Sequence, residues 1–184
     1  MGKIFVTSDL HFGHDRGFLY EPRGFKNIED HDETVIANWN NVVSDEDDVY
    51  VLGDLMLNDN EHGVECIKKL KGKIHIIYGN HDTDARKKFY DELGVVHGWA
   101  DVIKYRKYNF YLSHFPTMTG NLEAESLHQC TLNIAGHTHS KDEFREDVPM
   151  YFNAAADANN NTPVLLDDVI EKMKEKAKEC LSYL

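Results

Sequence analysis

Hydrophobic residues follow two different spacings along this chain, and the spacing predicts where strands and helices lie. Short runs rich in β-branched and aromatic residues, with little polar alternation, are typical of strands covered on both faces. They predict strands over residues 3–8, 48–52, 73–78, 101–105, 109–113, 131–135 and 150–154. Apolar positions that recur at helical spacing predict helices over residues 28–43, 61–70 and 167–181. A further helix is predicted over residues 84–93, with Thr83 or Asp84 as its cap and Gly94 at its end.

The order of these elements indicates the fold class. Strands alternate with helices in the first half of the chain, whereas strands dominate the second half. We therefore predict an α/β fold with a mixed sheet. Residues 12–28 hold three glycines, a proline and two arginines and are predicted to form a long loop, a kind of segment that is often functional in a compact domain. Residues 157–162 are predicted to be a polar loop, and residues 118–128 fit neither pattern.

Composition narrows the class of protein. No repeat, low-complexity tract or linker interrupts the chain, so residues 1–184 are expected to form a single domain. The formal net charge of −12 repels phosphate backbones, which argues against long nucleic acid as a partner. The cysteines, Cys66, Cys130 and Cys180, are odd in number and far apart, which predicts free thiols in a reducing compartment.

The chain is also expected to be cytoplasmic and not attached to a membrane. No apolar run approaches the roughly 20 residues of a membrane span, and the chain starts directly in a strand pattern without the features of a signal peptide. The sequence leaves the oligomeric state open.

Potential metal ligands follow five of the predicted strands. The blocks are Asp9-Leu10-His11, Gly53-Asp54, Gly79-Asn80-His81-Asp82, His114 and Gly136-His137-Thr138-His139. Because strand ends can converge in space, these scattered residues can form one site. Extended backbone would point both side chains of each D-x-H or H-x-H pair to the same side. Oxygen and imidazole donors without thiolate suit Mn²⁺, Fe²⁺, Zn²⁺ or Ni²⁺.

The order D-x-H, G-D, G-N-H-D, H and G-H-x-H over residues 9–139 resembles the signature of the calcineurin-like metallophosphoesterases. The resemblance implies two packed mixed β-sheets flanked by helices, in a four-layer sandwich, and a dinuclear metal centre. It implies that one cation binds Asp9, His11, Asp54 and His139. It implies that the other binds Asp54, Asn80, His114 and His137, with Asp54 bridging both.

The same resemblance implies a phosphoric ester hydrolase that acts on a small phosphomonoester or phosphodiester. Two divalent ions, with manganese expected first and iron, zinc or nickel as alternatives, would hold a bridging hydroxide that attacks phosphorus. His81 would contact the phosphate or protonate the leaving oxygen, and Asp82 would orient His81. No covalent phosphoenzyme is needed.

Two details refine the resemblance. Many family members read G-D-x-x-D-x-G at the second block, whereas this chain has Gly53-Asp54-Leu55-Met56-Leu57-Asn58 and lacks the second aspartate. That departure concerns the support of the site rather than its ligands. The run His11-Phe12-Gly13-His14, followed by Arg23-Gly24-Phe25, resembles a small bacterial and phage branch of the superfamily.

His14 and Arg23, in the loop of residues 12–28, are candidates to contact a substrate phosphate, because arginine binds phosphate with two hydrogen bonds. The alternative is a surface loop with ordinary charges. Other histidines are predicted outside the site, with His75 half-buried in a strand and the rest at the surface or in loops: His31, His62, His97 and His128.

Two other functions stay open at this point. One is a non-catalytic interaction scaffold with the same fold. The other is a nuclease, which would need a basic track; the lysines and arginine of residues 68–73 and 86–88 are the clusters that the sequence offers for it.

Overall fold

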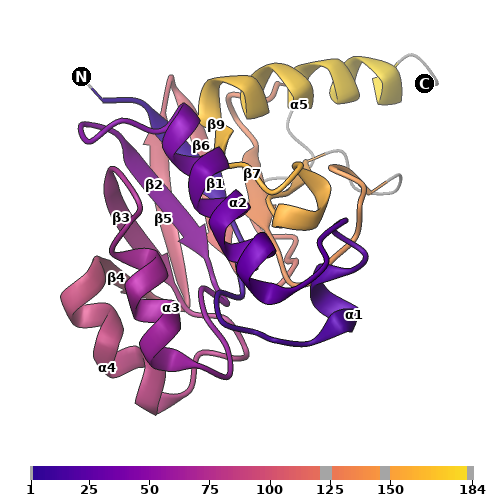
Figure 1. Ribbon diagram of the computed structural model, residues 1–184. Helices are drawn as coiled ribbons and strands as arrows, with labels where there is room; N and C mark the ends of the chain where they lie inside the picture. Colours follow the sequence, from indigo (N-terminus) through magenta and orange to yellow (C-terminus); the bar gives the residue numbers. More distant parts are fainter. Residues whose placement is uncertain (1, 121–125, 146–149, 182–184) are drawn as a thin grey trace.

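The computed structural model describes residues 2–120, 126–145 and 150–181, and shows two mixed β-sheets with helices around them (Figure 1). The first sheet has the order β4-β3-β2-β1-β9, in which β1 to β4 run parallel and β9 is antiparallel to β1. Its strands are β1 (Ile4–Thr7), β2 (Asp48–Leu52), β3 (Lys73–Ile77), β4 (Val95–Gly98) and β9 (Val164–Leu165).

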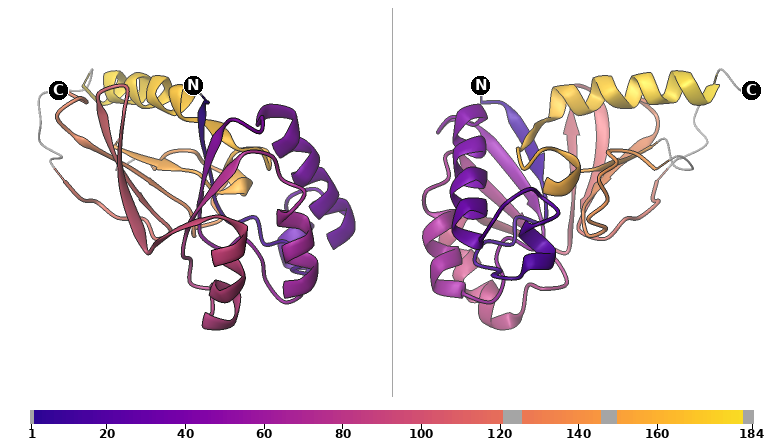
Figure 2. Two further views of the ribbon diagram at one scale, coloured as in Figure 1. Left: turned by 90° about the vertical axis from the view of Figure 1, so that its left-hand side faces the viewer. Right: turned by 45° about the vertical axis from the view of Figure 1, so that its right-hand side comes forward.

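The second sheet has the order β5-β6-β7-β8, with β5 antiparallel to β6 and the other pairs parallel. Its strands are β5 (Ala100–Tyr105), β6 (Tyr108–Ser113), β7 (Thr131–Ala135) and β8 (Tyr151–Asn153). The helices are α1 (Gly17–Tyr20), α2 (Ile28–Val42), α3 (Asn60–Ile67), α4 (Asp84–Leu93), the 3-10 helix η1 (Ala156–Ala158) and α5 (Leu166–Leu181). Figure 2 shows α2, α3 and α4 on one side of the first sheet and the second sheet on the other.

Strands of the first sheet carry apolar residues on both faces, which explains their continuous hydrophobic runs. Within β2, Val49 and Val51 pack into the cluster under α2, α3 and α4, whereas Tyr50 and Leu52 pack into the cluster shared with the second sheet and α5. The side chain of Trp39 is completely buried in the first of these clusters. The two packed mixed sheets flanked by helices that the sequence predicted are therefore confirmed.

Helix α2 begins where the sequence supplies a cap. The side chain of Asn27 accepts a hydrogen bond from the Asp30 amide, and Glu29 and Asp30 place negative charge in the first turn. In the same way, Asp59 accepts from the amide of His62 at the start of α3. These two caps fix the helices that carry Asp32, His62 and Cys66.

The sequence missed three short elements. Strand β4 has 4 residues and β9 has 2, both at sheet edges, and α1 has 4 residues inside the predicted loop of residues 12–28. Such pieces are too short to show a period. The predicted polar loop of residues 157–162 begins inside η1. Residues 121–125, within the segment that fits no pattern, lie outside the described residues.

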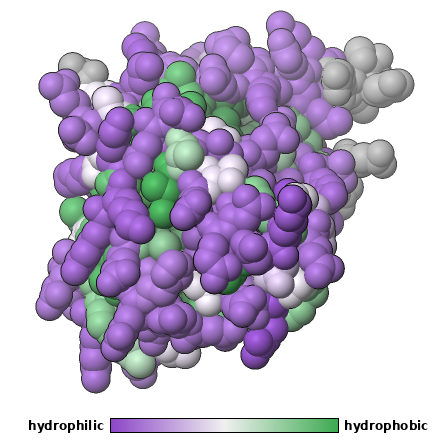
Figure 3. Space-filling model, viewed as in Figure 1, coloured by the Kyte–Doolittle hydropathy of each residue, from purple (hydrophilic) through white to green (hydrophobic). Residues whose placement is uncertain are grey.

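Hydrophilic residues cover most of the face seen in Figure 3, and hydrophobic residues show between them in small groups. Within the described ranges, none of the helices combines the length and the hydrophobicity that crossing a membrane requires.

Candidate metal centre

The predicted ligands all follow the carboxyl ends of strands from both sheets. These ends meet at one place, as in other α/β sheets. Asp9 and His11 follow β1, Asp54 follows β2, Asn80 follows β3, His114 follows β6, and His137 and His139 follow β7.

One group of donor atoms gathers around the side chains that follow β1. The Nε2 atom of His11 lies 3.3 Å from Nε2 of His139 and 3.9 Å from Oδ1 of Asp9. The Nε2 atom of His139 lies 3.6 Å from the same Asp9 oxygen. Oδ2 of Asp54 is 3.9 Å from Nε2 of His11. These four donors can surround one cation.

A second group gathers around His114. Its Nε2 atom lies 2.8 Å from Oδ1 of Asn80, 3.2 Å from Nδ1 of His137 and 3.5 Å from Oδ2 of Asp54. Asp54 therefore stands between the two groups through the same oxygen. The structure brings the seven predicted ligands together in the two sets that the family resemblance implied.

Hydrogen bonds fix which nitrogen of each ring faces the cluster. Nδ1 of His114 donates to the carbonyl oxygen of Leu52 at 2.8 Å, which turns Nε2 toward the cluster. Nδ1 of His139 likewise donates to Oδ2 of Asp157 at 2.9 Å. With Nδ1 engaged in this way, Nε2 of each ring faces the other donor atoms, where it can bind a cation.

In this cluster one buried carboxylate oxygen lacks a hydrogen-bond partner and two side chains have a shifted pKa, as expected of a site that binds divalent cations. Oδ1 of Asp9 is buried without a hydrogen-bond partner, which is costly for a carboxylate oxygen. Burial raises the pKa of Asp54 to about 6. Burial lowers the pKa of His11 well below its ordinary value, which keeps the ring neutral. A cation beside Asp9 and Asp54 would supply the missing partner.

The backbone differs from the expectation of extended D-x-H and H-x-H pairs. Five of the predicted ligands have left-handed φ values, 58° at Asp9, 54° at His11, 54° at Asp54, 70° at His137 and 48° at His139. The condition of extended backbone is therefore not met, because the chain already turns away from each strand at these residues. Left-handed backbone is unfavourable for residues other than glycine and is often found at functional sites.

Two glycines allow the ligand loops to approach each other. A Cβ atom on Gly79 would overlap the carboxylate of Asp54, and a Cβ atom on Gly53 would overlap the ring of His114. Gly53 also has a φ of 93°, which glycine adopts without strain. The glycine before each of these ligand blocks thus serves close packing between loops.

Asp82 has different contacts from those expected. Its Oδ2 accepts hydrogen bonds from the amides of Gly79, at 2.6 Å, and Asp54, at 3.1 Å, and its Oδ1 accepts one from the Tyr90 hydroxyl. In the described part of the chain, no hydrogen bond joins either oxygen to the His81 ring, so the prediction that Asp82 orients this ring is corrected. Asp82 joins two ligand loops instead and supports Asp54, whereas the buried Leu57 stands at the position of the family's second aspartate.

His81 is exposed at the mouth of the cluster, with its ring centroid 5.7 Å from that of His11. Its amide donates to Oδ1 of Asp54 at 3.0 Å. A cavity of about 510 Å³ lies over this region, and its lining combines imidazole and charged groups with an apolar wall: His11, His14, His81, His139, Lys141, Asp157, Phe18, Leu19, Pro22 and Leu57.

His14 lines this cavity, with its ring centroid 5.5 Å from that of His11. Burial lowers the pKa of His14 to about 4, so the ring is neutral and would meet a ligand by hydrogen bonding rather than by charge. Nδ1 of His14 is buried without a hydrogen-bond partner. Its contact with substrate stays a prediction.

Arg23 does not line the cavity. Its side chain is 1% exposed, and it donates through Nη2 and Nε to both carboxylate oxygens of Asp157, at 2.7 and 3.0 Å. Nη2 also donates to the carbonyl of Asp9 at 2.8 Å, and Nη1 lies 3.0 Å from Nε2 of His31. A phosphate could reach Arg23 only if the guanidinium left these partners, so the structure places it as a support of Asp157.

Asp157 is the site residue that the sequence reasoning missed. It orients His139, and its hydrogen bonds with His139 and Arg23 outweigh its burial and lower its pKa to about 2. The sequence around it resembles only a polar loop, so no local signal could have found it. The prediction that His31 lies at the surface was also wrong, since the residue is completely buried between Arg23 and Asp32.

Comparison with known proteins agrees with this geometry. The model of the calcineurin-like phosphoesterase superfamily domain matches residues 3–161. An uncharacterised protein of Methanocaldococcus jannaschii is 38% identical over 186 residues, which cover 97% of this chain and 94% of that protein.

Two solved structures share the fold. A protein of unknown function from Aquifex aeolicus superposes with a TM-score of 0.70 at 23% identity, over 93% of this chain and 99% of that one. An archaeal phosphodiesterase superposes with a TM-score of 0.50 at 17% identity, over 82% of each chain. With the family model covering most of its length, the chain belongs to the calcineurin-like phosphoesterase superfamily.

Proposed function

We propose that this protein is a metal-dependent hydrolase of a small phosphomonoester or phosphodiester and that it binds two divalent cations. The observation that carries the proposal is the position of Asp54. Its Oδ2 atom lies 3.9 Å from Nε2 of His11 and 3.5 Å from Nε2 of His114, so that one carboxylate oxygen is shared by two groups of donors. Manganese is the first candidate, and iron, zinc or nickel are the alternatives.

When bound, two divalent cations supply Lewis acidity for water activation and offset the charge of the phosphoryl group. The protein's own residues set the geometry. Leu52 and Asp157 hold the rings of His114 and His139 with Nε2 toward the cluster. His81 is exposed beside them, where its ring can donate a hydrogen bond to a phosphoryl or leaving oxygen.

The cavity supports a substrate of limited size. A volume of about 510 Å³ accommodates a small organic phosphate ester. Phe18, Leu19, Pro22 and Leu57 form an apolar wall that suits an ester group with a hydrophobic or planar part. Lys141 lines the same cavity and adds a positive charge for an anionic ligand.

The decisive test is hydrolysis of aryl phosphate monoesters and diesters with Mn²⁺ added. Asp54→Asn keeps the size of the side chain but weakens the shared ligand, so we expect turnover to fall by about 100-fold or more. Asp45→Asn, an exposed carboxylate in the turn before β2, is the matched control and should behave as the unchanged protein does. Short single-stranded oligonucleotides in the same assay test the nuclease alternative.

Two results would refute the proposal. One is full turnover in folded Asp54→Asn. The other is an unchanged protein that binds no cation in elemental analysis, which is what the scaffold alternative predicts.

A further inference from the structure

We propose that Asp32, His62 and Cys66 form a separate site for a single divalent cation of the zinc type. Asp32 comes from α2, whereas His62 and Cys66 stand four residues apart on α3 and so share one face of that helix. The site contains none of the ligands of the phosphoesterase centre and does not depend on its function.

The three donor atoms lie at distances that suit tetrahedral coordination. Nε2 of His62 is 2.8 Å from Oδ2 of Asp32 and 3.4 Å from Sγ of Cys66, and Sγ is 3.9 Å from the same oxygen. Ligand bonds of about 2.0–2.3 Å around tetrahedral zinc place neighbouring ligand atoms about 3.3–3.6 Å apart. Shifts of about half an ångström in these side chains would bring all three distances into that range.

Hydrogen bonds between these three side chains explain their arrangement less well than a bound cation does. The single proton on Nε2 of His62 can point to only one acceptor, and Asp32 at 2.8 Å takes it. The thiol then has the Asp32 oxygen, at the long distance of 3.9 Å, as its acceptor. Three donor atoms that converge on one point, rather than joining in pairs, are what a cation site requires.

The carboxylate of Asp32 is held in place in the way that metal ligands usually are. Its Oδ1 lies 2.7 Å from Nδ1 of His31, and its Oδ2 also accepts a hydrogen bond from the amide of Gly13 at 3.0 Å. Such outer contacts orient a ligand before the cation arrives. Asp32 and Cys66 are buried, and the side chain of His62 is 37% exposed, so a cation and a water molecule as fourth ligand can enter from that side.

The donor set selects the class of cation. A thiolate, an imidazole and a carboxylate favour Zn²⁺, or Co²⁺ in its place, over Mn²⁺ or Mg²⁺. Burial raises the pKa of Cys66 to about 12, so the sulfur is a thiol until a cation displaces its proton. The phosphoesterase centre has only oxygen and nitrogen donors among its predicted ligands, so the two sites differ in chemistry.

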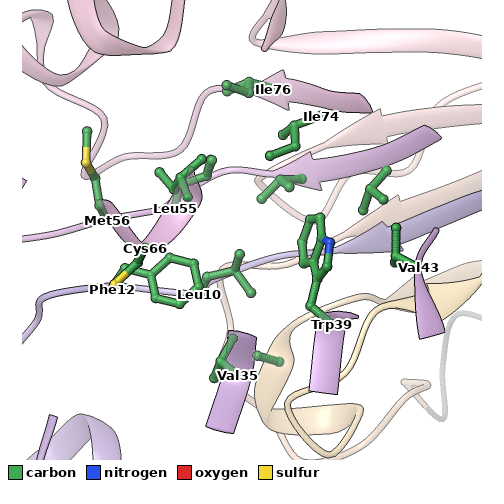
Figure 4. Close-up of a cluster of buried hydrophobic side chains, with 14 of the residues drawn as sticks. Leu10, Phe12, Val35, Trp39, Val43, Leu55, Met56, Cys66, Ile74 and Ile76 are labelled. Carbon is green, nitrogen blue, oxygen red and sulfur yellow. The ribbon is translucent and has the colours of Figure 1, made fainter. Parts of the chain in front are cut away.

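A cation at this site would tie the loop of the phosphoesterase centre to two helices. Gly13 stands between His11 and His14, and its amide is bonded to the ligand oxygen of Asp32. Figure 4 shows Cys66 among the buried side chains under the first sheet, in the same cluster as Phe12, which follows His11. The site therefore acts as a clamp that stabilises the loop, without contact with substrate.

Cobalt titration of the metal-free, full-length protein tests the proposal. Thiolate bound to Co²⁺ gives a near-ultraviolet charge-transfer absorption that oxygen and nitrogen ligands do not give. We expect this absorption in the unchanged protein and its loss in Cys66→Ser. Cys130→Ser, in the other core cluster, and Cys180→Ser are matched controls that should retain it. Asp54→Asn should also retain it while losing hydrolysis, which separates this site from the proposed function.

Absence of the absorption from the unchanged protein at saturating Co²⁺ would overturn the proposal, and so would its persistence in Cys66→Ser. If Cys66→Ser does not fold, His62→Gln serves instead, because the His62 side chain is partly exposed. We expect at least a tenfold loss of Zn²⁺ affinity in that variant, measured by competition with a chromophoric chelator. An unchanged affinity contradicts the site.

Discussion

At the scale of one residue, Asp157 shows how this protein holds a predicted metal ligand, His139, in its orientation. The carboxylate accepts from Nδ1 of His139 and is itself held by two hydrogen bonds from Arg23. In Asp157→Asn the amide holds the ring less firmly, so we expect Mn²⁺ affinity to fall by about 10–100-fold. Isothermal titration with Mn²⁺ measures the change.

The matched control is Asp142→Asn, an exposed carboxylate of the loop that follows His139. It should leave Mn²⁺ affinity unchanged. Equal affinities in Asp157→Asn and the unchanged protein would mean that the orientation of His139 does not depend on Asp157.

Asp47 gives a pH-dependent contribution to stability. Its carboxylate accepts from the amides of Ser44, at 2.8 Å, and Lys3, at 2.7 Å, and these backbone hydrogen bonds lower its pKa. The contribution is therefore present above the unfolded pKa of about 3.9 and is lost as pH falls below it. We expect Asp47→Asn to lower the free energy of unfolding by about 1 kcal/mol at pH 7.

Urea denaturation at pH 7 and at pH 3 checks this expectation. The difference between Asp47→Asn and the unchanged protein should shrink at the lower pH, and Asp45→Asn should show little difference at either. A difference that is the same at both pH values would exclude the charge of Asp47 as its cause.

At the scale of elements, α4 supports the ligand loops from outside the sheet. The hydroxyl of the buried Tyr90 donates to Asp82, whose other oxygen joins the loops of Asp54 and Asn80. Tyr90→Phe removes that donor and leaves a buried carboxylate oxygen without it, so we expect the free energy of unfolding to fall by about 1–3 kcal/mol.

Chemical denaturation measures the loss in Tyr90→Phe. Tyr20→Phe, in α1, is the control, because the hydroxyl of Tyr20 lies outside this network, and it should change the free energy of unfolding little. Equal stability of Tyr90→Phe and the unchanged protein would show that Asp82 does not need this donor.

A strand could be predicted from the sequence where both of its faces are buried, and a helix where one continuous stripe of its side chains is buried. Strand β2 lies at the predicted residues and helix α2 within one residue of them, because burial imposes an uninterrupted run in one and a regular period in the other. Strands β4 and β9 depend on pairing with β3 and β1, which no local pattern encodes. The order of the ligand blocks could be recognised in the sequence for the same reason, since each block follows a buried strand.

The supports of the site could not be predicted because they are formed by contacts between distant segments. Arg23 meets Asp157 across 134 positions of the chain, and Asp82 meets the amide of Asp54 across 28. The left-handed backbone at Asp9 and His11 was equally hidden, since aspartate and histidine carry no requirement for it. Sequence indicates which donors are available, whereas tertiary contacts decide how they are held.

At the scale of the whole molecule, the fold itself should depend on bound cations. Without them, Oδ1 of Asp9 is a buried oxygen with no partner, and burial raises the pKa of Asp54 to about 6. A cation that binds only the folded state adds about 2.7 kcal/mol at a concentration of a hundred times its Kd. We therefore expect Mn²⁺ to raise the Tm of the chelator-treated protein by roughly 5 °C or more.

Two cations and two variants separate the sites in the same thermal measurement. Asp54→Asn should lose most of the shift caused by Mn²⁺ but keep a shift with Zn²⁺, because the thiolate set of Asp32, His62 and Cys66 prefers zinc. Cys66→Ser should show the reverse, with the Mn²⁺ shift intact and the Zn²⁺ shift reduced. If Tm is the same with chelator and with Mn²⁺, the converging carboxylates and imidazoles are stable by themselves, and the cation dependence expected of the folded state is refuted.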